Sequence, residues 1–567
     1  MAGQLASPPP SPRRLPSLRQ ALRVGAAGDG WHKPALSAVA TLAAVNLTLL
    51  ALGRLDLALY TSAGALVALY GHGLPYPARG RRLAAVAAGT VASTGIALTA
   101  AALTGSVAVL VAVSAALAAL HKVVCDAARI GPPGNIIITF TSAGCAFAPG
   151  RIADLPFHLA LTAAGAALAW LVCMAPALAR PYGPERIAVA RAAQAAARLL
   201  RSGPGRSPQA RTALAAAVNA ARHSLALSSA ARRRALGDTL ERLLIHSESA
   251  LAADPDQEER ADQEERADRE DREERAERYE SWARDLRRGR PLPRPVLNPA
   301  EEHELAATGL RPPLPGGRPW QALHPGSPLL PVGLRVTVGC AAAGWVSMGL
   351  GVGRPYWAVV TAASVFQANG SMSGQRAVQR VLGNLLGLVL FTALLPVSRS
   401  GQLALILLGL LCQFGAEATI ARNYWLASVF VTPMALLMTE FADSHPARAM
   451  VTDRWLDSCI GALAGLAACL LVTNRRTATR LDHALTGVQD AARAALAAAT
   501  GDAAPARARL SHALVELREA SDTATGEWRR RTLPHQRVAD AERTGHRLLA
   551  TLVGHRAGGH GGTTAAP

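Results

Sequence analysis

Two arginines, Arg376 and Arg380, lie four positions apart and are the best candidates in this sequence to bind an anion. Residues with this spacing share one face of a helix, and two guanidinium groups on one face can hold a carboxylate through paired hydrogen bonds. Gln375 lies next to the pair, and Gln379 and Asn384 follow closely, so all three could line the same pathway. The alternative is that both arginines only mark a cytoplasmic loop, where basic residues are enriched.

Two carboxylates, Asp126 and Glu417, each end an apolar run and are each followed by an arginine, Arg129 or Arg422. A charge at membrane depth costs roughly 2.5 to 3.5 kcal/mol on insertion scales, so such residues are candidates for function. We expect either carboxylate to carry a proton whose binding is coupled to anion movement. The alternative is an ion pair that closes a helix end at the membrane surface. Asp457 is expected only to cap the start of the last apolar run.

Other kinds of chemistry are not predicted. The two lysines, Lys33 and Lys122, are not part of a Gly-Lys-Ser/Thr motif, which excludes a P-loop ATPase within this chain. The seven cysteines lie in or beside apolar runs without CxxC spacing, and we interpret them as small buried hydrophobic residues. We therefore expect no enzyme activity, no catalytic residue, no metal and no cofactor. The net charge of +19 does not indicate nucleic-acid binding, because much of it adjoins apolar runs, beside anionic lipid headgroups.

The candidate residues belong to a chain that is too apolar for a string of soluble domains. From Ala35 to Met174 only ten residues are charged, far below the roughly 25% that is usual for soluble chains. Charge is absent from Leu83 to Leu120, which is about twice the roughly 20 residues that one bilayer crossing needs. The expected fold is an all-α polytopic membrane protein with about twelve transmembrane helices. The predicted spans lie near residues 35–53, 57–73, 83–103, 106–121, 135–149, 155–178, 336–353, 356–370, 380–396, 401–417, 424–439 and 456–473.

The two apolar blocks are similar to each other. The run from Arg54 to Gly71 aligns with Arg354 to Gly370 at an offset of about 300, which indicates a weak internal repeat. Six spans per block give both halves the same orientation, so the prediction is two parallel six-helix repeats. Arginines are more frequent in alternate loops, which predicts that both termini are cytoplasmic and that the protein lies in the cytoplasmic (inner) membrane. On this topology Arg454 belongs to the last outer loop.

Five regions follow from this arrangement. A disordered cytoplasmic N-terminus, a first transmembrane block, a cytoplasmic region, a second transmembrane block and a cytoplasmic helical tail are expected over residues 1–34, 35–178, 179–330, 331–475 and 476–567, respectively. The cytoplasmic region should contain amphipathic helices, a charged run built on a repeated DQEERA motif, and a Pro-rich linker.

Aromatic and small residues indicate how the spans are anchored and packed. Tyr356 and Trp357 adjoin a predicted span, and aromatic residues at span ends usually anchor a helix at the membrane interface. Glycines with GxxxG spacing let helices approach closely, and we expect them to pack helices within the chain rather than to form a dimer face. Examples are Gly383 with Gly387 and Gly461 with Gly465.

The run RPYWAVVTAASVFQANGSMSGQRAVQRVLGNLLGLVL, from Arg354 to Leu390, resembles the fusaric acid resistance protein-like family and its integral membrane transporter domain. The shared pattern is an aromatic pair, a span, a polar turn, and an Arg-containing helix with a stripe of small residues. The first block departs from this pattern, since Leu55 and Asp56 stand where Tyr and Trp would be expected. The Arg-rich, Lys-poor composition is similar to that of chains from high-GC actinobacteria.

The resemblance implies export of aromatic carboxylic acids driven by the proton gradient. It implies substrate binding by Tyr356, Trp357, Gln375, Arg376 and Arg380. We therefore predict a secondary transporter for such acids. Its partners would be the small organic anion and the lipid bilayer, with a homo-oligomer left open. Two alternatives are a passive anion channel of the same architecture and a membrane-anchored scaffold that acts through its cytoplasmic helices.

Overall fold

The computed structural model describes most of the two apolar blocks and much of the polar regions that follow them. The described residues are 22–25, 30–131, 133–148, 150–202, 208–228, 239–250, 265–291, 295–297, 324, 327, 329–367, 370–439, 447–472, 476–498, 504–525, 536–538, 540–542, 544–545 and 548–549. Nearly all of the predicted N-terminal region, the first DQEERA copy and most of the Pro-rich linker lie outside these residues.

The described chain is helical, and its regular elements contain no strand. In the first block the helices are α2 (His32–Ala51), α3 (Ala58–Ala65), α4 (Tyr76–Leu103), α5 (Val107–Ala127), α6 (Ile136–Ala146) and α7 (Leu155–Met174), with 3-10 turns at Leu55–Leu57, Leu66–Leu69 and Ile152–Asp154. In the second block they are α15 (Leu330–Gly349), α16 (Tyr356–Val365), α17 (Gly370–Ser398), α18 (Gln402–Ile420), α19 (Tyr424–Thr439) and α20 (Ala447–Leu471). Each of the twelve predicted spans therefore overlaps a helix.

Eight of these helices are long and apolar enough to cross a membrane, as judged over the described residues. The other four apolar segments are shorter, and they lie at Leu55–Leu69, Ile136–Ala146, Tyr356–Val365 and Tyr424–Met438. A helix rises about 1.5 Å per residue, so the ten residues of α16 cover only about half of a hydrocarbon core about 30 Å thick. The chain is thus a helical protein with several candidate membrane spans, and the number twelve stays a prediction.

The short helices occupy the second and fifth positions of each block, so both blocks show the same order of lengths. The packing partners also correspond. In the first block α3 packs on α7 and α4 on α6, while in the second block α16 packs on α20 and α17 on α19. Between the blocks, α5 packs on α15 and α2 packs on α18. The fourth helix of each block therefore packs on the first helix of the other block.

A glycine on the sixth helix of each block makes one of these contacts possible. A Cβ atom on Gly165 would lie 2.2 Å from the carbonyl oxygen of Thr61, and one on Gly461 would lie 2.5 Å from that of Ala358. Only glycine lets the two backbones approach this closely. Gly383 and Gly387 of α17 likewise face α19. The prediction that these glycines pack helices within the chain is confirmed for the described contacts.

The helix of the third predicted span, near residues 83–103, begins earlier in the structure, at Tyr76. Arg79, Arg81 and Arg82 lie in the first turns of α4. Arg79 is buried, and its guanidinium donates hydrogen bonds to three carbonyl oxygens: those of Gly71 (3.0 Å), His72 (2.6 Å) and Cys173 (3.3 Å). Because these bonds satisfy the arginine, the helix begins before the apolar run that the sequence shows.

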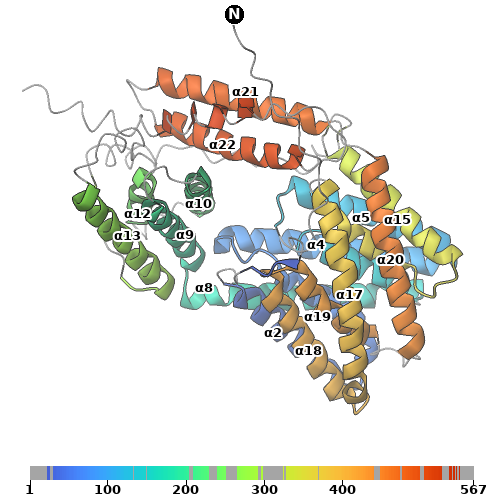
Figure 1. The fold of residues 1–567 in the computed structure, drawn as a ribbon. Coiled ribbons are helices and arrows are strands. Elements are labelled where there is room, and N and C mark those ends of the chain that lie inside the picture. The colour runs from blue at the N-terminus through green and yellow to red at the C-terminus, as the bar shows by residue number, and fades with distance from the viewer. Residues whose placement is uncertain are drawn as a thin grey trace, which may run out of the picture.

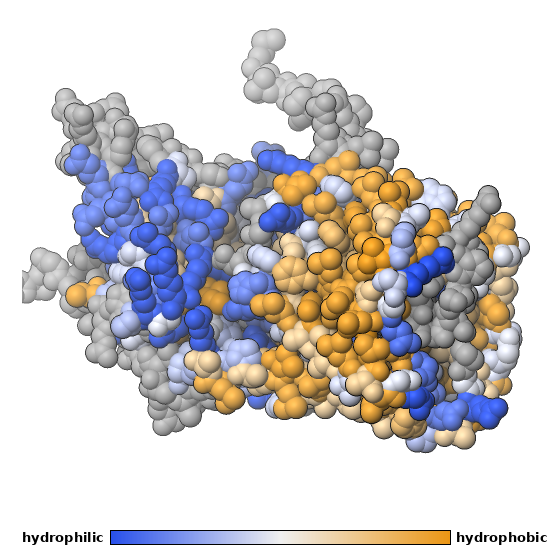
Figure 2. Space-filling model, turned by 90° about the horizontal axis from the view of Figure 1, so that it is seen from below, coloured by the Kyte–Doolittle hydropathy of each residue, from blue (hydrophilic) through white to orange (hydrophobic). Residues whose placement is uncertain are grey.

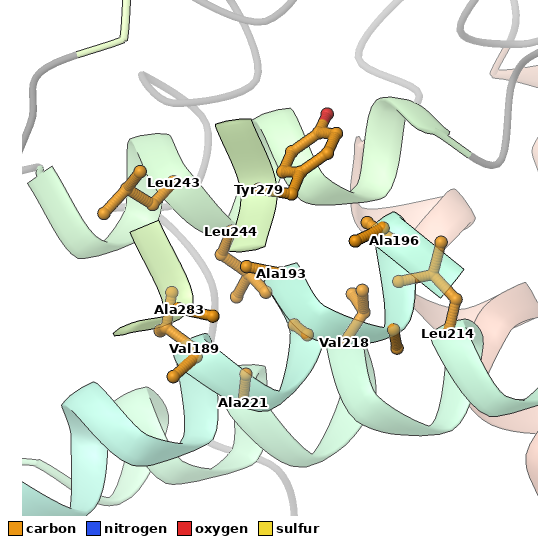
Figure 3. Packing of buried hydrophobic residues seen from close by; sticks show 14 of the residues in the cluster. Val189, Ala193, Ala196, Leu214, Val218, Ala221, Leu243, Leu244, Tyr279 and Ala283 are labelled. Carbon is orange, nitrogen blue, oxygen red and sulfur yellow. The ribbon is translucent and has the colours of Figure 1, made fainter. Parts of the chain in front are cut away.

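The polar helices form two further groups. The first comprises α9 (Gly183–Arg201), α10 (Pro208–Leu227), α12 (Thr239–Ser249) and α13 (Glu265–Arg288), and it follows the short α8 (Pro176–Ala179). Figure 3 shows its core, in which apolar side chains such as Val189, Val218 and Leu244 meet between the helices. The second group is the pair α21 (Arg476–Ala497) and α22 (Ala504–Thr525). This agrees with the predicted helical regions after each apolar block.

The apolar helices and the polar helices occupy different parts of the molecule. Figure 1 shows the apolar helices gathered in one body, with α21 and α22 along its upper side and α9 to α13 at the left. Figure 2 shows hydrophobic residues concentrated over the apolar body and hydrophilic residues over the other end. An apolar surface of this kind suits contact with lipid.

Candidate functional site

The predicted arginines meet at a tyrosine in the second block. The guanidinium carbon of Arg376 lies 3.2 Å from the centre of the Tyr424 ring. Arg380, one helical turn further along α17, donates from Nη1 to the Tyr424 hydroxyl at 3.1 Å, and its side chain is 4% exposed. Cation–π contact and a hydrogen bond thus hold both guanidinium groups on the first residue of α19.

The predicted aromatic pair forms the next layer. Tyr356 and Trp357 are the first two residues of α16 and are buried, with ring centres 4.8 Å apart. Phe140 of α6 lies 5.6 Å from Trp357, and Phe147, just after α6, lies 5.4 Å from Tyr356. These distances are typical of favourable ring contacts. The pair is therefore part of an aromatic cluster between the two blocks, and burial argues against an interfacial anchor.

Arg454 of α20 joins the cluster, although the sequence predicted it in an outer loop. Its guanidinium carbon lies 3.9 Å from the centre of the Trp357 ring, and the residue is 1% exposed. Nε, Nη1 and Nη2 of Arg454 have no hydrogen-bond acceptor within the described chain. Arg380 is close enough to repel it electrostatically. The structure therefore places a buried cation with unused donors beside an aromatic ring.

Asp457 lies three positions after Arg454 and is fully buried. Its Oδ1 accepts a hydrogen bond from the Ser347 hydroxyl of α15 at 2.5 Å, whereas Oδ2 has no donor among the described residues. The prediction that Asp457 caps the start of the last span is wrong, because α20 begins at Ala447. The polar residues before the apolar run are helical too.

Asn384 connects the three helices that carry the arginines and the tyrosine. Its Nδ2 donates to the Ser458 hydroxyl of α20 at 2.5 Å, and its Oδ1 accepts from the Thr432 hydroxyl of α19 at 2.6 Å. Asn384 itself lies on α17, one turn after Arg380. Because a buried amide with both ends bonded fixes its neighbours, Asn384 sets the relative position of the arginine-bearing helices.

The predicted proton carriers lie elsewhere. Asp126 forms an ion pair with Lys122 on α5, with Nζ 3.0 Å from Oδ1. Glu417 of α18 accepts a hydrogen bond from Gln413 at 3.4 Å. Arg129 pairs with Glu516 of α22 rather than with Asp126. Neither carboxylate has a described contact with the cluster, so their roles stay predictions.

Gln375 is half-buried on α17, one position before Arg376. Seven buried residues and the half-buried Arg376 are called the arginine–aromatic cluster below. The seven are Tyr356, Trp357, Arg380, Asn384, Tyr424, Arg454 and Asp457. Sequence reasoning missed Tyr424, Arg454 and Asp457 as site residues. Spacing contained a signal, since Arg454, Ser458, Gly461 and Gly465 recur every three or four positions and so share one helical face.

The chemistry of the cluster favours an anion. Arg376 and Arg380 each have an Nε without a described acceptor, as does the indole Nε1 of Trp357. Burying a guanidinium without a hydrogen-bonded counter-charge costs several kcal/mol. A carboxylate can accept two parallel hydrogen bonds from one guanidinium and satisfy it. The arrangement is therefore suited to a carboxylate attached to an aromatic or other flat apolar group.

Comparison with known proteins agrees with this region of the chain. Residues 340–468 match the family described as fusaric acid resistance protein-like. The chain is 29% identical over 241 residues to the uncharacterized membrane protein YvaC of Bacillus subtilis (strain 168), a match that covers 41% of this chain and 37% of that protein. It is also 29% identical over 143 residues to the uncharacterized protein slr1298 of Synechocystis sp. (strain ATCC 27184 / PCC 6803 / Kazusa), covering 25% and 19%.

The chain thus spans well under half of the length of these two relatives. No solved structure matches it. Residues 340–468 contain every residue of the arginine–aromatic cluster, together with Glu417. The resemblance predicted from Arg354 to Leu390 is confirmed, and the part of the chain that carries the cluster matches the fusaric acid resistance protein-like family.

Proposed function

We propose that the protein is a secondary transporter that exports organic, in particular aromatic, carboxylic acids across the cytoplasmic membrane. The observation that carries this proposal is the arginine–aromatic cluster. Arg376, Arg380 and Arg454 are gathered among buried rings, and nitrogen atoms of all three have no described acceptor. A cluster that only stabilised the fold would not need three cations without a carboxylate bonded to them.

The aromatic residues support the choice of substrate class. Trp357 already carries the Arg454 guanidinium on its ring, which leaves the in-plane N–H groups of Arg454 free to point at a carboxylate. Tyr356, Phe140 and Phe147 extend this apolar wall. Flat rings gain from stacking or edge contacts with such residues, so an aromatic acid can satisfy both the cationic and the apolar parts.

The architecture supports transport rather than catalysis. The apolar helices would form two parallel six-helix repeats, a proposal supported by the shared order of long and short helices and by the corresponding packing pairs. The cluster lies where short helices α16 and α19 pack against long helices α17 and α20. Transporters with internal repeats often place substrate sites beside interrupted or short helices. Both termini would be cytoplasmic, and a homo-oligomer is compatible with this arrangement.

Flux of labelled 4-hydroxybenzoate into proteoliposomes that contain the purified full chain tests the proposal. Protein-dependent flux is expected above that of protein-free liposomes, and Arg380→Gln should reduce it at least tenfold. Arg399→Gln is the matched control, because Arg399 is an exposed arginine just after α17 and should leave the flux unchanged. A wild-type protein that moves none of a panel of aromatic carboxylates would refute the proposal.

Imposed gradients identify the driving force in the same vesicles. An anion that moves alone responds to membrane potential, which supplies about 2.3 kcal/mol per charge per 100 mV. Flux that follows an imposed pH gradient indicates proton coupling. Flux with single-channel currents and no response to pH would instead indicate the passive anion channel.

A further inference from the structure

We infer that Arg454 and Asp457 form a switchable pair in which the anion and a proton bind together. When Asp457 is protonated, Arg454 binds the carboxylate of the substrate. When Asp457 is ionised, it takes Arg454 as its own counter-ion and the substrate is released. This inference rests on the proposed function and assigns its proton coupling to a residue inside the arginine–aromatic cluster.

The geometry of the pair is suited to this exchange. Arg454 and Asp457 lie three positions apart on α20 and therefore on neighbouring parts of one helix face. Arg454 is 1% exposed and Asp457 is 0% exposed. All three guanidinium nitrogens of Arg454 lack a described acceptor, and Oδ2 of Asp457 lacks a described donor. The two groups are thus adjacent and buried, and neither uses its bonding capacity on the other.

The surroundings of Asp457 leave one oxygen atom for the switch. Ser347 on α15 occupies Oδ1. The titratable group that faces Asp457 from α16 is the Tyr356 hydroxyl, and on α20 itself the half-buried Asp453 also interacts with it electrostatically. From α17, Arg380 acts on Arg454. Oδ2 is therefore the atom that can carry either a proton or a hydrogen bond from Arg454.

Charge balance explains why the proton should accompany the anion. With Asp457 ionised, the pair has a net charge of zero. With Asp457 protonated and a carboxylate on Arg454, the pair with its ligand again has a net charge of zero. An anion bound at Arg454 while Asp457 stays ionised would place two carboxylates at one guanidinium, and their mutual repulsion favours protonation of Asp457. Each carboxylate bound at Arg454 should therefore bring one proton to Asp457.

Two consequences follow for binding and transport. Affinity for the carboxylate should fall by about tenfold per pH unit once Asp457 is ionised in the free protein, because one proton is linked to each binding event. The acid and its proton should cross in the same direction as a neutral unit. Export would then be driven by a higher concentration of the acid inside the cell, and an inward proton gradient would oppose it. An imposed pH gradient should therefore change the flux, and a membrane potential should not.

Proton uptake on binding tests the pair directly. 4-Hydroxybenzoate is added to the purified full chain in weakly buffered detergent solution, and a pH indicator reports the protons taken up while calorimetry reports the anion bound. The wild-type protein should take up close to one proton per anion. Asp457→Asn should still bind the anion but take up none, and its affinity should no longer change with pH.

Two further variants complete the experiment. Asp482→Asn, at an exposed aspartate of α21, is the control and should keep the proton uptake of the wild type. Arg454→Gln should weaken binding at least tenfold. If the wild type binds the anion without proton uptake, or if Asp457→Asn takes up protons as before, the inference is wrong while the proposed function stands. If the wild type binds no aromatic carboxylate, the proposed function fails, and the inference fails with it.

Discussion

Glu248 should hold the two polar helix groups together. It lies on α12, is almost fully buried, and forms ion pairs with Arg222 of α10 and with Arg507 of α22. Next to this network, Asn219 of α10 and Ser511 of α22 exchange two hydrogen bonds of 3.1 Å. Glu248 is thus a carboxylate that these two arginines share, and it connects the helices after the first block to the tail after the second.

The Glu248→Gln substitution would remove the charge of the buried carboxylate that Arg222 and Arg507 both contact. Removing one partner of a buried ion pair typically costs about 3 to 5 kcal/mol. The matched control is Glu273→Gln, because Glu273 pairs with Arg201 at 2.8 Å on the surface and such exposed pairs contribute less than about 1 kcal/mol. Amide hydrogen exchange of α12 and α22 in the full chain measures the difference, since each 1.4 kcal/mol changes protection about tenfold.

Protection of both helices should fall by about two to three orders of magnitude in Glu248→Gln and by less than about tenfold in Glu273→Gln. Burial alone would raise the pKa of Glu248, but Arg222 and Arg507 overcome this effect and lower the pKa below its ordinary value of 4.5. The stabilisation is therefore fully present above about pH 4.5 and is lost as the pH falls through the lowered value. Equal protection in the two variants would refute the reasoning.

Two other predictions concern the apolar helices, and thermal unfolding in detergent checks both. Gly461→Ala should destabilise the protein by about 1 to 3 kcal/mol, because the new Cβ would lie 2.5 Å from the carbonyl oxygen of Ala358. Gly409→Ala should stabilise α18 by about 0.5 to 1 kcal/mol, because no atom lies within 4 Å of the new Cβ. A change in stability of the same sign in both variants would contradict the packing described above. Arg79→Gln should lower the melting temperature clearly, because it removes buried hydrogen bonds to carbonyl oxygens, whereas the exposed Arg81→Gln should have little effect.

The apolar runs were sufficient to predict where the helices lie, because burial of backbone polar groups in an apolar setting requires helices. They were not sufficient to predict where helices begin. The structure starts α4 at Tyr76 and α20 at Ala447, each well before the apolar run. In both cases arginines extend the helix, and contacts far away in sequence stabilise them. Arg79 bonds to carbonyl oxygens, and Arg454 lies on the Trp357 ring.

The same limit applies to the candidate site. Arg376 and Arg380 could be predicted, because their spacing alone puts them on one helix face. Arg454 and Asp457 were missed because a count of charges assigns polar residues to loops, while their burial depends on packing against α15 and α16. Asp126 and Glu417 were predicted as proton carriers because they end apolar runs. A position at the end of a run does not indicate which residues of other helices lie nearby, so it could not predict whether either carboxylate contacts the cluster.

The most direct test of the central claim compares a carboxylate with its neutral amide. Flux of labelled 4-hydroxybenzoate and of 4-hydroxybenzamide is measured in proteoliposomes with the wild-type chain and with the Arg454→Gln variant, and the flux in protein-free liposomes is subtracted from each. If the buried arginines recognise the anion, the wild type should move the carboxylate at least tenfold faster than the amide, and Arg454→Gln should abolish this preference. Equal rates for the two compounds in the wild type, or an unchanged preference in Arg454→Gln, would contradict the account.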